Sequence, residues 1–461
     1  MVICPRCGEP SREGAALCRR CLGRLDGAAP LIEAECQDDN ARRAPRWFGA
    51  SGSRWLRLGG IVLAVVAAAL VGSRVLGIGR SAAPFEPPAS SVRTLSDGPE
   101  VWSSPNGGTA GTRATTATPA LAGREVWRVT LGRGAHSSLI AGAEAIYVGV
   151  GERELVAIDA NDGSERWRSD MGGVMDAAPV LADDRLYVGL RDGRVLAIDT
   201  PAGSIAWTYA GPSPVEAPAL VAAGVVYAVS NTDLLALNAE TGALLGARGL
   251  GDRLALASPA LERDRVAVAT FERVLFFDRQ SGAETFHLNR VFPGERASVA
   301  IESAHVYIVT RRGLVAFDRD VRLPWWERIR AAWDWANLVG IAPAVPWRAA
   351  VWAQPLEARA LGVATGGGLV LVAWEGGRVV AFDAATGTRR WWSDVPDLAS
   401  APILTAAGVL VSVGAALILL DFRTGAEIDR RPVGDERVDD FIVTSHGTYY
   451  LTSAGDLVAL R

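Results

Sequence analysis

A unit of about 40 residues recurs through most of the chain, and this period constrains the fold more than any other feature of the sequence. In one copy, residues 186–199 read as a strand, an Asp-Gly turn and a second strand. Gly203 and Trp207 follow at a further turn and strand. The residue that ends the second strand recurs at Asp159, Asp199, Asn238, Asp278, Asp318, Asp383 and Asp421. Four short strands per unit at this period are typical of a β-propeller blade, so we expect a mainly β fold.

The recurring Asp, which we call the anchor, is interpreted as the start of a tight turn. A Gly follows four residues later at Gly163, Gly203, Gly242, Gly282, Gly387 and Gly425. A Trp follows eight residues later at Trp167, Trp207, Trp326 and Trp391. An Asp side chain accepts hydrogen bonds from the backbone of its own turn, and Gly tolerates positive φ. The alternative, in which the anchors are metal ligands, explains their regular repetition less well.

The two ends of the repeat region predict the number of blades. Trp127 lies 32 residues before Asp159, which is also the spacing from Trp167 to the next anchor. Residues 125–131 therefore read as an outermost strand without inner strands before it, and residues 455–461 as an inner strand without an outer one after it. If the two segments share one blade, they close the ring and leave no exposed sheet edge. Seven anchors and this composite blade predict eight blades.

The pattern Tyr-Val-Gly, Asp-Gly-x-Val-Leu-Ala-Ile-Asp, Gly and Trp resembles the pyrroloquinoline-quinone-type repeat over about residues 125–461. It is similar to the propeller lipoprotein of the bacterial outer-membrane barrel-assembly machinery, which implies an eight-bladed propeller over residues 124–461. The resemblance also implies that the repeated Trp residues pack between neighbouring blades. It is specific for the fold and says less about the function.

Quinoprotein dehydrogenases share this repeat, so the resemblance also raises an enzyme hypothesis. Those enzymes need a pocket for pyrroloquinoline quinone (PQQ), a calcium site and a catalytic carboxylate, often beside a disulfide of adjacent Cys residues. All five Cys of this chain lie before Gln37, so the propeller has no such disulfide. Its four His residues are scattered, at His136, His287, His305 and His446. We therefore predict no catalytic residues and no bound PQQ.

Two Cys-x-x-Cys pairs stand at the N-terminus, formed by Cys4 with Cys7 and by Cys18 with Cys21. Four thiolates at this spacing bind Zn²⁺ tetrahedrally without a vacant position, so the predicted site is structural. Residues 1–26 have little apolar content, and metal binding must supply their folding energy, on the order of 10 kcal/mol. The segment resembles the short zinc ribbons at the start of many bacterial membrane proteins. It has no aromatic residue for base stacking, so no nucleic acid is expected.

Residues 58–79 form an apolar run that only Arg74 interrupts. As a helix this run would rise roughly 33 Å, enough to cross a bilayer core of about 30 Å. A cleaved signal peptide fits poorly, because the zinc ribbon would precede it, and a buried core helix is a further alternative. Residues 27–57, a predicted linker, carry five Arg close to the run. The positive-inside rule then keeps the N-terminus in the cytoplasm of a single-pass inner-membrane protein, with a periplasmic or extracellular propeller.

Two further segments carry no repeat. Residues 80–123 are rich in Pro, Ser, Thr, Ala and Gly, and we expect a flexible linker. An insertion at residues 324–357 separates two anchors and is rich in Trp. It is expected either to bind a partner or the membrane interface, or to pack as a flap on its own propeller. The candidate partner-binding residues are Trp325, Trp333, Trp335, Trp347 and Trp352.

These expectations combine into one functional hypothesis. The sequence favours a membrane-anchored, non-enzymatic propeller that serves as an extracytoplasmic scaffold for another envelope protein. A sensor that binds a small molecule in the propeller channel and a quinoprotein oxidoreductase are the alternatives.

The zinc prediction is tested on the purified full-length protein. We expect about one zinc ion per chain by elemental analysis, since four thiolates complete one tetrahedral site. Cys7→Ser and Cys21→Ser should each lose the metal, whereas Cys36→Ser, outside the two pairs, should keep it. Unchanged zinc content in the first two variants would contradict the predicted site.

Overall fold

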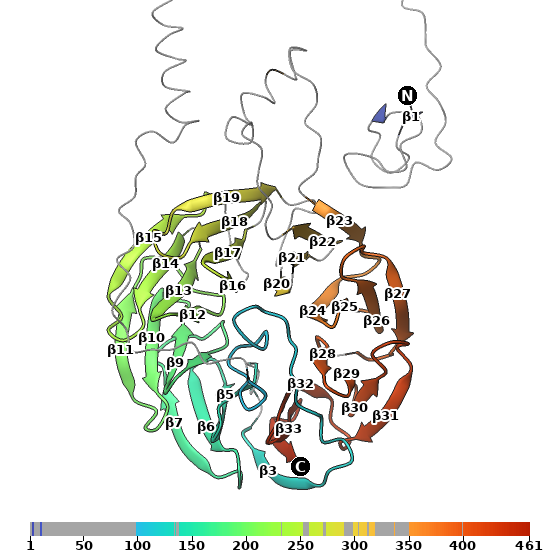
Figure 1. Ribbon diagram of the computed structural model, residues 1–461. Coiled ribbons are helices and arrows are strands. Elements are labelled where there is room, and N and C mark those ends of the chain that lie inside the picture. The colour runs from blue at the N-terminus through green and yellow to red at the C-terminus, as the bar shows by residue number, and fades with distance from the viewer. Residues whose placement is uncertain are drawn as a thin grey trace, which may run out of the picture. The chain divides into compact units, whose positions relative to one another are not determined.

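The structure is a computed structural model of the 461-residue chain (Figure 1). It describes residues 98–461, apart from several gaps, and two short strands near the N-terminus, β1 (Val2–Ile3) and β2 (Pro10–Ser11). The gaps are residues 133, 135–137, 232, 252–257, 271–272, 290–297, 303, 311–312, 319–335, 337–349 and 399. The chain divides into two compact units, Met1–Ile78 and Gly79–Arg461, and the second holds the propeller.

Eight four-stranded antiparallel sheets form a ring, each with one strand at the centre and one at the rim (Figure 1). From the innermost strand outward, the first four blades are β4 (Ile140–Ala141), β5 (Ala145–Val150), β6 (Glu154–Asp159), β7 (Glu165–Asp170); β8 (Val180–Ala182), β9 (Arg185–Gly189), β10 (Arg194–Asp199), β11 (Ile205–Ala210); β12 (Leu220–Ala222), β13 (Val225–Ser230), β14 (Asp233–Asn238), β15 (Leu244–Gly249); and β16 (Ala260–Glu262), β17 (Arg265–Ala269), β18 (Arg273–Asp278), β19 (Glu284–Asn289). The next three blades are β20 (Ser298–Glu302), β21 (His305–Val309), β22 (Gly313–Asp318), β23 (Ala350–Pro355); β24 (Ala360–Gly366), β25 (Leu369–Trp374), β26 (Arg378–Asp383), β27 (Arg389–Asp394); and β28 (Ile403–Thr405), β29 (Gly408–Val413), β30 (Ala416–Leu420), β31 (Glu427–Pro432). The composite blade is β32 (Val438–Thr444), β33 (Gly447–Thr452), β34 (Asp456–Leu460) and β3 (Glu125–Thr130).

The composite blade closes the ring as the sequence predicted. Strand β3 pairs antiparallel with β34, so that Trp127 lies opposite Ala459. The main chains of Arg124 and Arg461 exchange two further hydrogen bonds of 2.8 and 3.0 Å. Each innermost strand contacts the next around the ring, and β32 contacts β4. The mainly β, eight-bladed propeller with N-terminal strand closure is therefore confirmed.

The anchor residues make the turns that the spacing predicted. The carboxylate of Asp159 accepts the N–H of Asn161 at 2.8 Å, and the carbonyl of Asp159 accepts the N–H of Gly163 at 3.0 Å. Gly163 has a φ of 78°, where a side chain would be strained. Asp421 repeats this geometry at the other end of the repeat region, where its carboxylate accepts the N–H of Arg423 at 3.0 Å and its carbonyl that of Gly425 at 2.9 Å. The turn interpretation is thus confirmed for these anchors.

Five blades dock onto the next blade through a Trp of the outermost strand. These residues are Trp127, Trp167, Trp207, Trp352 and Trp391. Each indole N–H donates to the carbonyl that follows the next blade's anchor; for example, Trp207 bonds Ala239 at 3.0 Å. The ring lies on the Gly of that same turn. A Cβ added to Gly203 would lie 2.5 Å from the ring of Trp167, so this Gly is required both for its φ of 67° and for space.

Three blades have another residue at the Trp position, and in two of them an Arg reaches the turn of the next blade at other carbonyls. In β15 the equivalent position is Gly246, and Arg248 two residues later donates to the carbonyl of Gly282 at 2.7 Å. In β31 the position is Asp429, and Arg431 donates to the carbonyls of Leu121 and Gly123. Where Gly246 replaces the Trp, the carbonyl after the next anchor, that of Arg279, accepts from the hydroxyl of Tyr227 at 3.2 Å instead.

One expectation about the repeat was wrong. The eight-residue spacing assigned the blade Trp after Asp318 to Trp326, which lies outside the described residues. Trp352 takes this position instead: it lies opposite Ala316 in β23 and donates to the carbonyl of Ala384 at 3.0 Å. The inserted residues enter between the anchor and the outermost strand, so counting forward from the anchor fails in this blade.

The packing of Trp on Gly gives a stability prediction. Gly203→Ala adds left-handed strain of about 1 kcal/mol and overpacking of about 1–3 kcal/mol against Trp167. Gly368→Ala is the control, because Gly368 also has a positive φ of 81° but has nothing within 4 Å of an added Cβ. Urea unfolding should show a larger loss of stability for Gly203→Ala. Equal losses in both variants would contradict the packing argument.

Candidate functional site at the centre of the ring

Residues 98–123, which we call the central segment, run once around the inside of the ring before they become β3 (cyan in Figure 1). The sequence predicted that residues 80–123 form a flexible linker. For the described part, residues 98–123, this was wrong, because Trp102, Ala117 and Leu121 are buried among the blades. The composition is that of a linker because the segment is held mainly by its backbone.

The geometry of the innermost strands explains this backbone binding. Strand β8 joins β9 through a two-residue turn closed by Ala182 and Arg185, which are a hydrogen-bonded pair. The preceding residue, Leu181, is then in a non-hydrogen-bonded position, and its N–H points to the centre of the ring. The same register recurs in the other innermost strands, so each blade presents one such N–H group. Buried N–H groups of this kind need an acceptor.

The central segment supplies acceptors to the innermost strands of six of the eight blades, in the order of the ring. The donors are the N–H groups of Ala141, Leu181, Leu261, Ile301, Thr365 and Leu404, and the respective acceptors are the carbonyls of Trp102, Ser103, Thr109, Ala110, Thr112 and Arg113, at 2.8–3.0 Å. The segment begins and ends at the composite blade, where Pro99 accepts the N–H of Ser445 and the N–H of Ala120 donates to Thr448. The segment therefore works as an inner ring that pairs with the blades.

Two buried side chains, those of Trp102 and Arg113, hold the central segment in the ring. Trp102 is 1% exposed and Arg113 is 8% exposed. The guanidinium carbon of Arg113 lies 5.8 Å from the centroid of the Trp102 ring, within range of a cation–π contact. Arg113 also donates to the carbonyls of Pro105 and Pro402. These contacts join Trp102 and Arg113, which are the two ends of the part of the central segment that pairs with the blades.

Arg113 carries a buried charge that has neutral hydrogen-bond acceptors. Burial lowers the pKa of Arg113, and burial raises the pKa of the nearby Asp440, while the attraction between the two groups opposes both shifts. The carboxylate of Asp440 accepts the N–H of Leu139 at 2.8 Å. A buried charge of this kind offsets part of the stabilisation that the surrounding hydrogen bonds give.

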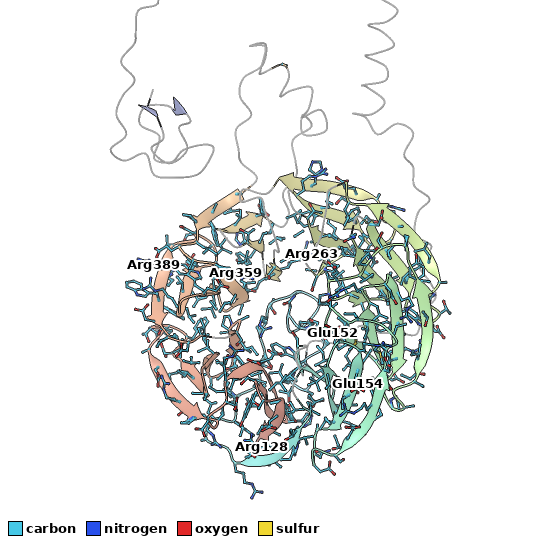
Figure 2. All side chains as sticks on the ribbon, turned by 180° about the vertical axis from the view of Figure 1, so that it is seen from behind. Arg128, Glu152, Glu154, Arg263, Arg359 and Arg389 are labelled. Atoms are coloured by element: carbon cyan, nitrogen blue, oxygen red, sulfur yellow. The ribbon has the colours of Figure 1, made fainter. Side chains whose placement is uncertain are left out.

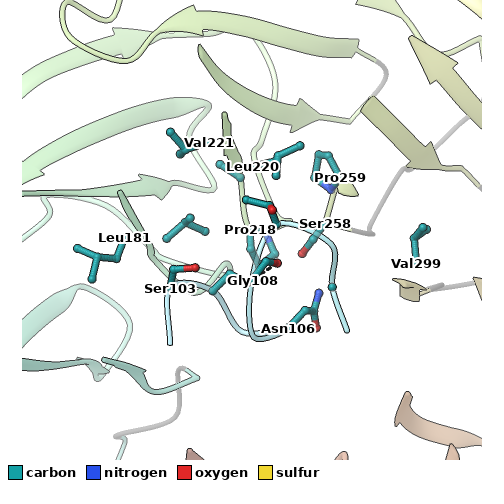
Figure 3. Close-up of a pocket in the computed structure, with 15 residues that line it drawn as sticks. Ser103, Asn106, Gly108, Leu181, Pro218, Leu220, Val221, Ser258, Pro259 and Val299 are labelled. Atoms are coloured by element: carbon teal, nitrogen blue, oxygen red, sulfur yellow. Dashed lines mark hydrogen bonds between the residues drawn. The ribbon is translucent and has the colours of Figure 1, made fainter. Parts of the chain in front are cut away.

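A small cavity lies beside β12, where the central segment does not pair with the innermost strand of the blade (Figure 3). It has a volume of about 20 Å³ and lies between β12 and the part of the segment from Ser103 to Thr109. The N–H of Val221 in β12 has the same register as that of Leu181. Among the described residues, no hydrogen bond joins the central segment to this N–H. The cavity has room for roughly one water molecule.

The sequence-predicted site residues are distributed differently from this centre. The predicted zinc ligands Cys4, Cys7, Cys18 and Cys21 and the predicted partner residues Trp325, Trp333, Trp335 and Trp347 lie outside the described residues. Trp352 is 8% exposed and packs between two blades, with its ring centroid 5.9 Å from that of Tyr307. Sequence reasoning missed Trp102 and Arg113; a buried-type aromatic within a Gly- and Ser-rich segment was the available signal.

No helix in the part of the chain that the structure describes is long and apolar enough to cross a membrane; the predicted span, residues 58–79, lies outside that part. Within the same described residues, no three His, Cys, Asp or Glu side chains come together as metal ligands would.

Eight blades, a closing N-terminal strand and docking Trp residues define a β-propeller of the quinoprotein-repeat class. A family model described as "Outer membrane protein assembly factor BamB" matches residues 112–327 and 344–460. The chain belongs to this family. A comparison with curated protein sequences gave no match.

Solved structures are similar to this chain in fold. BamB from Moraxella catarrhalis superposes with a TM-score of 0.55 at 17% identity and covers 73% of this chain and 97% of its own. Quinohemoprotein alcohol dehydrogenase from Comamonas testosteroni gives a TM-score of 0.58 at 14% identity, over 78% of this chain and 80% of its own. The computationally designed Ika8 protein gives 0.58 at 12% identity, over 74% and 100%. Identities this low establish the fold alone.

The pairing of the central segment predicts a pattern of amide hydrogen exchange. The N–H of Val221 should exchange roughly two- to tenfold faster than those of Leu181 and Leu261, because a typical hydrogen bond contributes about 0.5–1.5 kcal/mol. Residue-resolved exchange measured by mass spectrometry or NMR checks this. Equal protection at all three positions would mean that the central segment does not pair as described.

Proposed function

We propose that the chain is a membrane-anchored, non-enzymatic scaffold whose propeller binds another protein of the bacterial envelope. The observation that carries this proposal is the filled centre: residues 102–113 pair with six blades where a propeller ligand would otherwise lie. A ring that is filled at its centre and closed at its edge offers a broad, rigid surface, and the loops between strands supply specificity.

The envelope location is supported by the family and by the N-terminal sequence. The family's description names an outer-membrane assembly factor, and BamB from Moraxella catarrhalis has a similar fold. The apolar run of residues 58–79 would anchor the chain in the inner membrane, with the propeller outside the cytoplasm. In the zinc ribbon, β1 pairs with β2, with Val2 opposite Ser11, so a hairpin flanks Cys4 and Cys7. Such a hairpin suits one half of a structural zinc site.

The proposed partner-binding residues are the Trp side chains of the insertion. Trp325, Trp333, Trp335 and Trp347 lie between Asp318, where β22 ends, and Ala350, where β23 begins. Aromatic residues are enriched at the centres of protein interfaces, where each buries a large area. Trp352 contributes differently, because its indole is used in docking two blades. It fixes the C-terminal end of the insertion to the ring.

A quinoprotein oxidoreductase is the second candidate, favoured by the shared fold with the alcohol dehydrogenase. A cofactor in the middle of this ring would need the space that the central segment occupies. A sensor of a small molecule in the channel meets the same obstacle. The scaffold is therefore the function that the geometry supports best.

The scaffold proposal is tested by crosslinking and capture from native membranes. Deletion of residues 324–347 leaves β23 and Trp352 intact and should abolish recovery of the partner. Trp333→Ala combined with Trp335→Ala should lower recovery by roughly tenfold or more, as truncation of interface aromatics does. Trp392→Ala is the control, because Trp392 is 50% exposed on the rim strand β27. The same partners at the same yield in all variants would exclude the insertion as the binding surface.

A further inference from the structure

We propose that the centre of the ring is a binding site for an extended polypeptide, and that the central segment is its resident occupant. The proposal adds a second site to the scaffold, distinct from the insertion. It follows from how the central segment is held, from which of its side chains are buried, and from where it leaves the ring.

Recognition at this site is by the backbone. Six inward N–H groups of the blades donate to carbonyls of the central segment. Hydrogen bonds also run in the opposite direction, because the N–H groups of Trp102 and Thr115 donate to the carbonyls of Ala141 and Leu404. Any extended chain presents carbonyls and N–H groups in this way, and this is the physical basis of strand addition in peptide-binding domains. The ring therefore accepts a class of ligand defined mainly by its conformation.

The side chains narrow this class. Gly111 packs so closely that an added Cβ would lie 2.5 Å from the carbonyl oxygen of Val299, and an added Cβ on Gly107 would lie 3.1 Å from the main chain of Arg113. Small residues are thus required at these two positions between Trp102 and Arg113. Trp102 and Arg113 are eleven positions apart, and they are the large side chains of the paired part of the segment that the ring buries. The matching ligand is a Gly-rich segment with an aromatic residue followed by an arginine at about this distance.

Two features make the occupant exchangeable. Burial of the Arg113 charge, with neutral carbonyls as acceptors and Asp440 as the nearby opposite charge, offsets part of what the contacts of Arg113 contribute. The segment also leaves the ring at β12, where the cavity beside Val221 borders Ser103, Asn106 and Thr109 (Figure 3). A competing chain can begin to pair with the N–H of Val221 before it displaces its neighbours.

The test uses the full-length protein and a fluorescent peptide with the sequence of residues 98–117. The double variant Trp102→Ala/Arg113→Ala removes the two buried side chains of the resident segment and so weakens its hold on the ring. Fluorescence anisotropy should show that the peptide binds this variant at least roughly tenfold more tightly than the unchanged chain, in which the linked segment competes at an effective concentration in the millimolar range. A peptide in which Ala replaces both the Trp and the Arg that correspond to Trp102 and Arg113 should bind neither protein.

A matched control separates the site from a general loss of Trp and Arg. The guanidinium carbon of Arg389 lies 4.5 Å from the centroid of the Trp392 ring, in a cation–π contact at the outer rim. Figure 2 labels Arg389. Arg389→Ala/Trp392→Ala should bind the peptide as weakly as the unchanged chain. A double variant at the centre that keeps its circular dichroism spectrum and yet fails to bind the peptide overturns the proposal. If that variant does not fold, Trp102→Ala alone is held to the same criterion.

Failure here and failure of the scaffold proposal are distinguishable. The peptide experiment changes the central segment and leaves the insertion intact, whereas deletion of residues 324–347 does the reverse. Loss of peptide binding with partner capture retained removes only the central site.

Discussion

An innermost strand of a propeller has a neighbour on one side only, and its other edge faces the centre of the ring. The amide groups on that edge are buried, so they need partners as firmly as those within the sheets. In this chain one segment meets the need for six blades in a single circuit. Its path, its small residues and its two buried anchors all follow from that requirement. The filled centre is thus a consequence of the fold's open inner edges.

The docking of the blades follows the same rule at the outer edge. A carbonyl after each anchor is exposed to the preceding blade, and a Trp such as Trp167 donates to it at 2.6 Å. Where the Trp is absent, Arg248 reaches the corresponding turn of the next blade. Tyr187 adds a hydroxyl to the carbonyl of Ala239, and burial there raises the pKa of this tyrosine to about 12. What recurs around the ring is therefore a turn whose carbonyls accept from the preceding blade, while the donor and the carbonyl it binds vary with the blade.

This distinction explains how much the sequence could predict. The turns need Asp and Gly in fixed places, so the period, the blade number and the closing strand could all be predicted. The central segment pairs main chain to main chain and leaves no period in its side chains, so its composition indicated a linker. The insertion hid the blade Trp because the spacing was counted from the anchor before it. Counted back from Asp383, Trp352 lies 31 residues away, close to the 32 between Trp127 and Asp159. The functional Trp candidates depended on composition alone, which specifies no contact.

The central segment and the closing strand are consecutive in the chain, so the centre and the seam of the ring are mechanically joined. Gly123, between them, fits so closely that an added Cβ would meet the carbonyl of Arg461, and Arg431 holds the carbonyls of Leu121 and Gly123. A pull on the chain from the N-terminal side reaches Pro99 first and then the pairing with one blade after another before it reaches β3. Since hydrogen bonds distributed around a ring must break in sequence, the seam is shielded from that load.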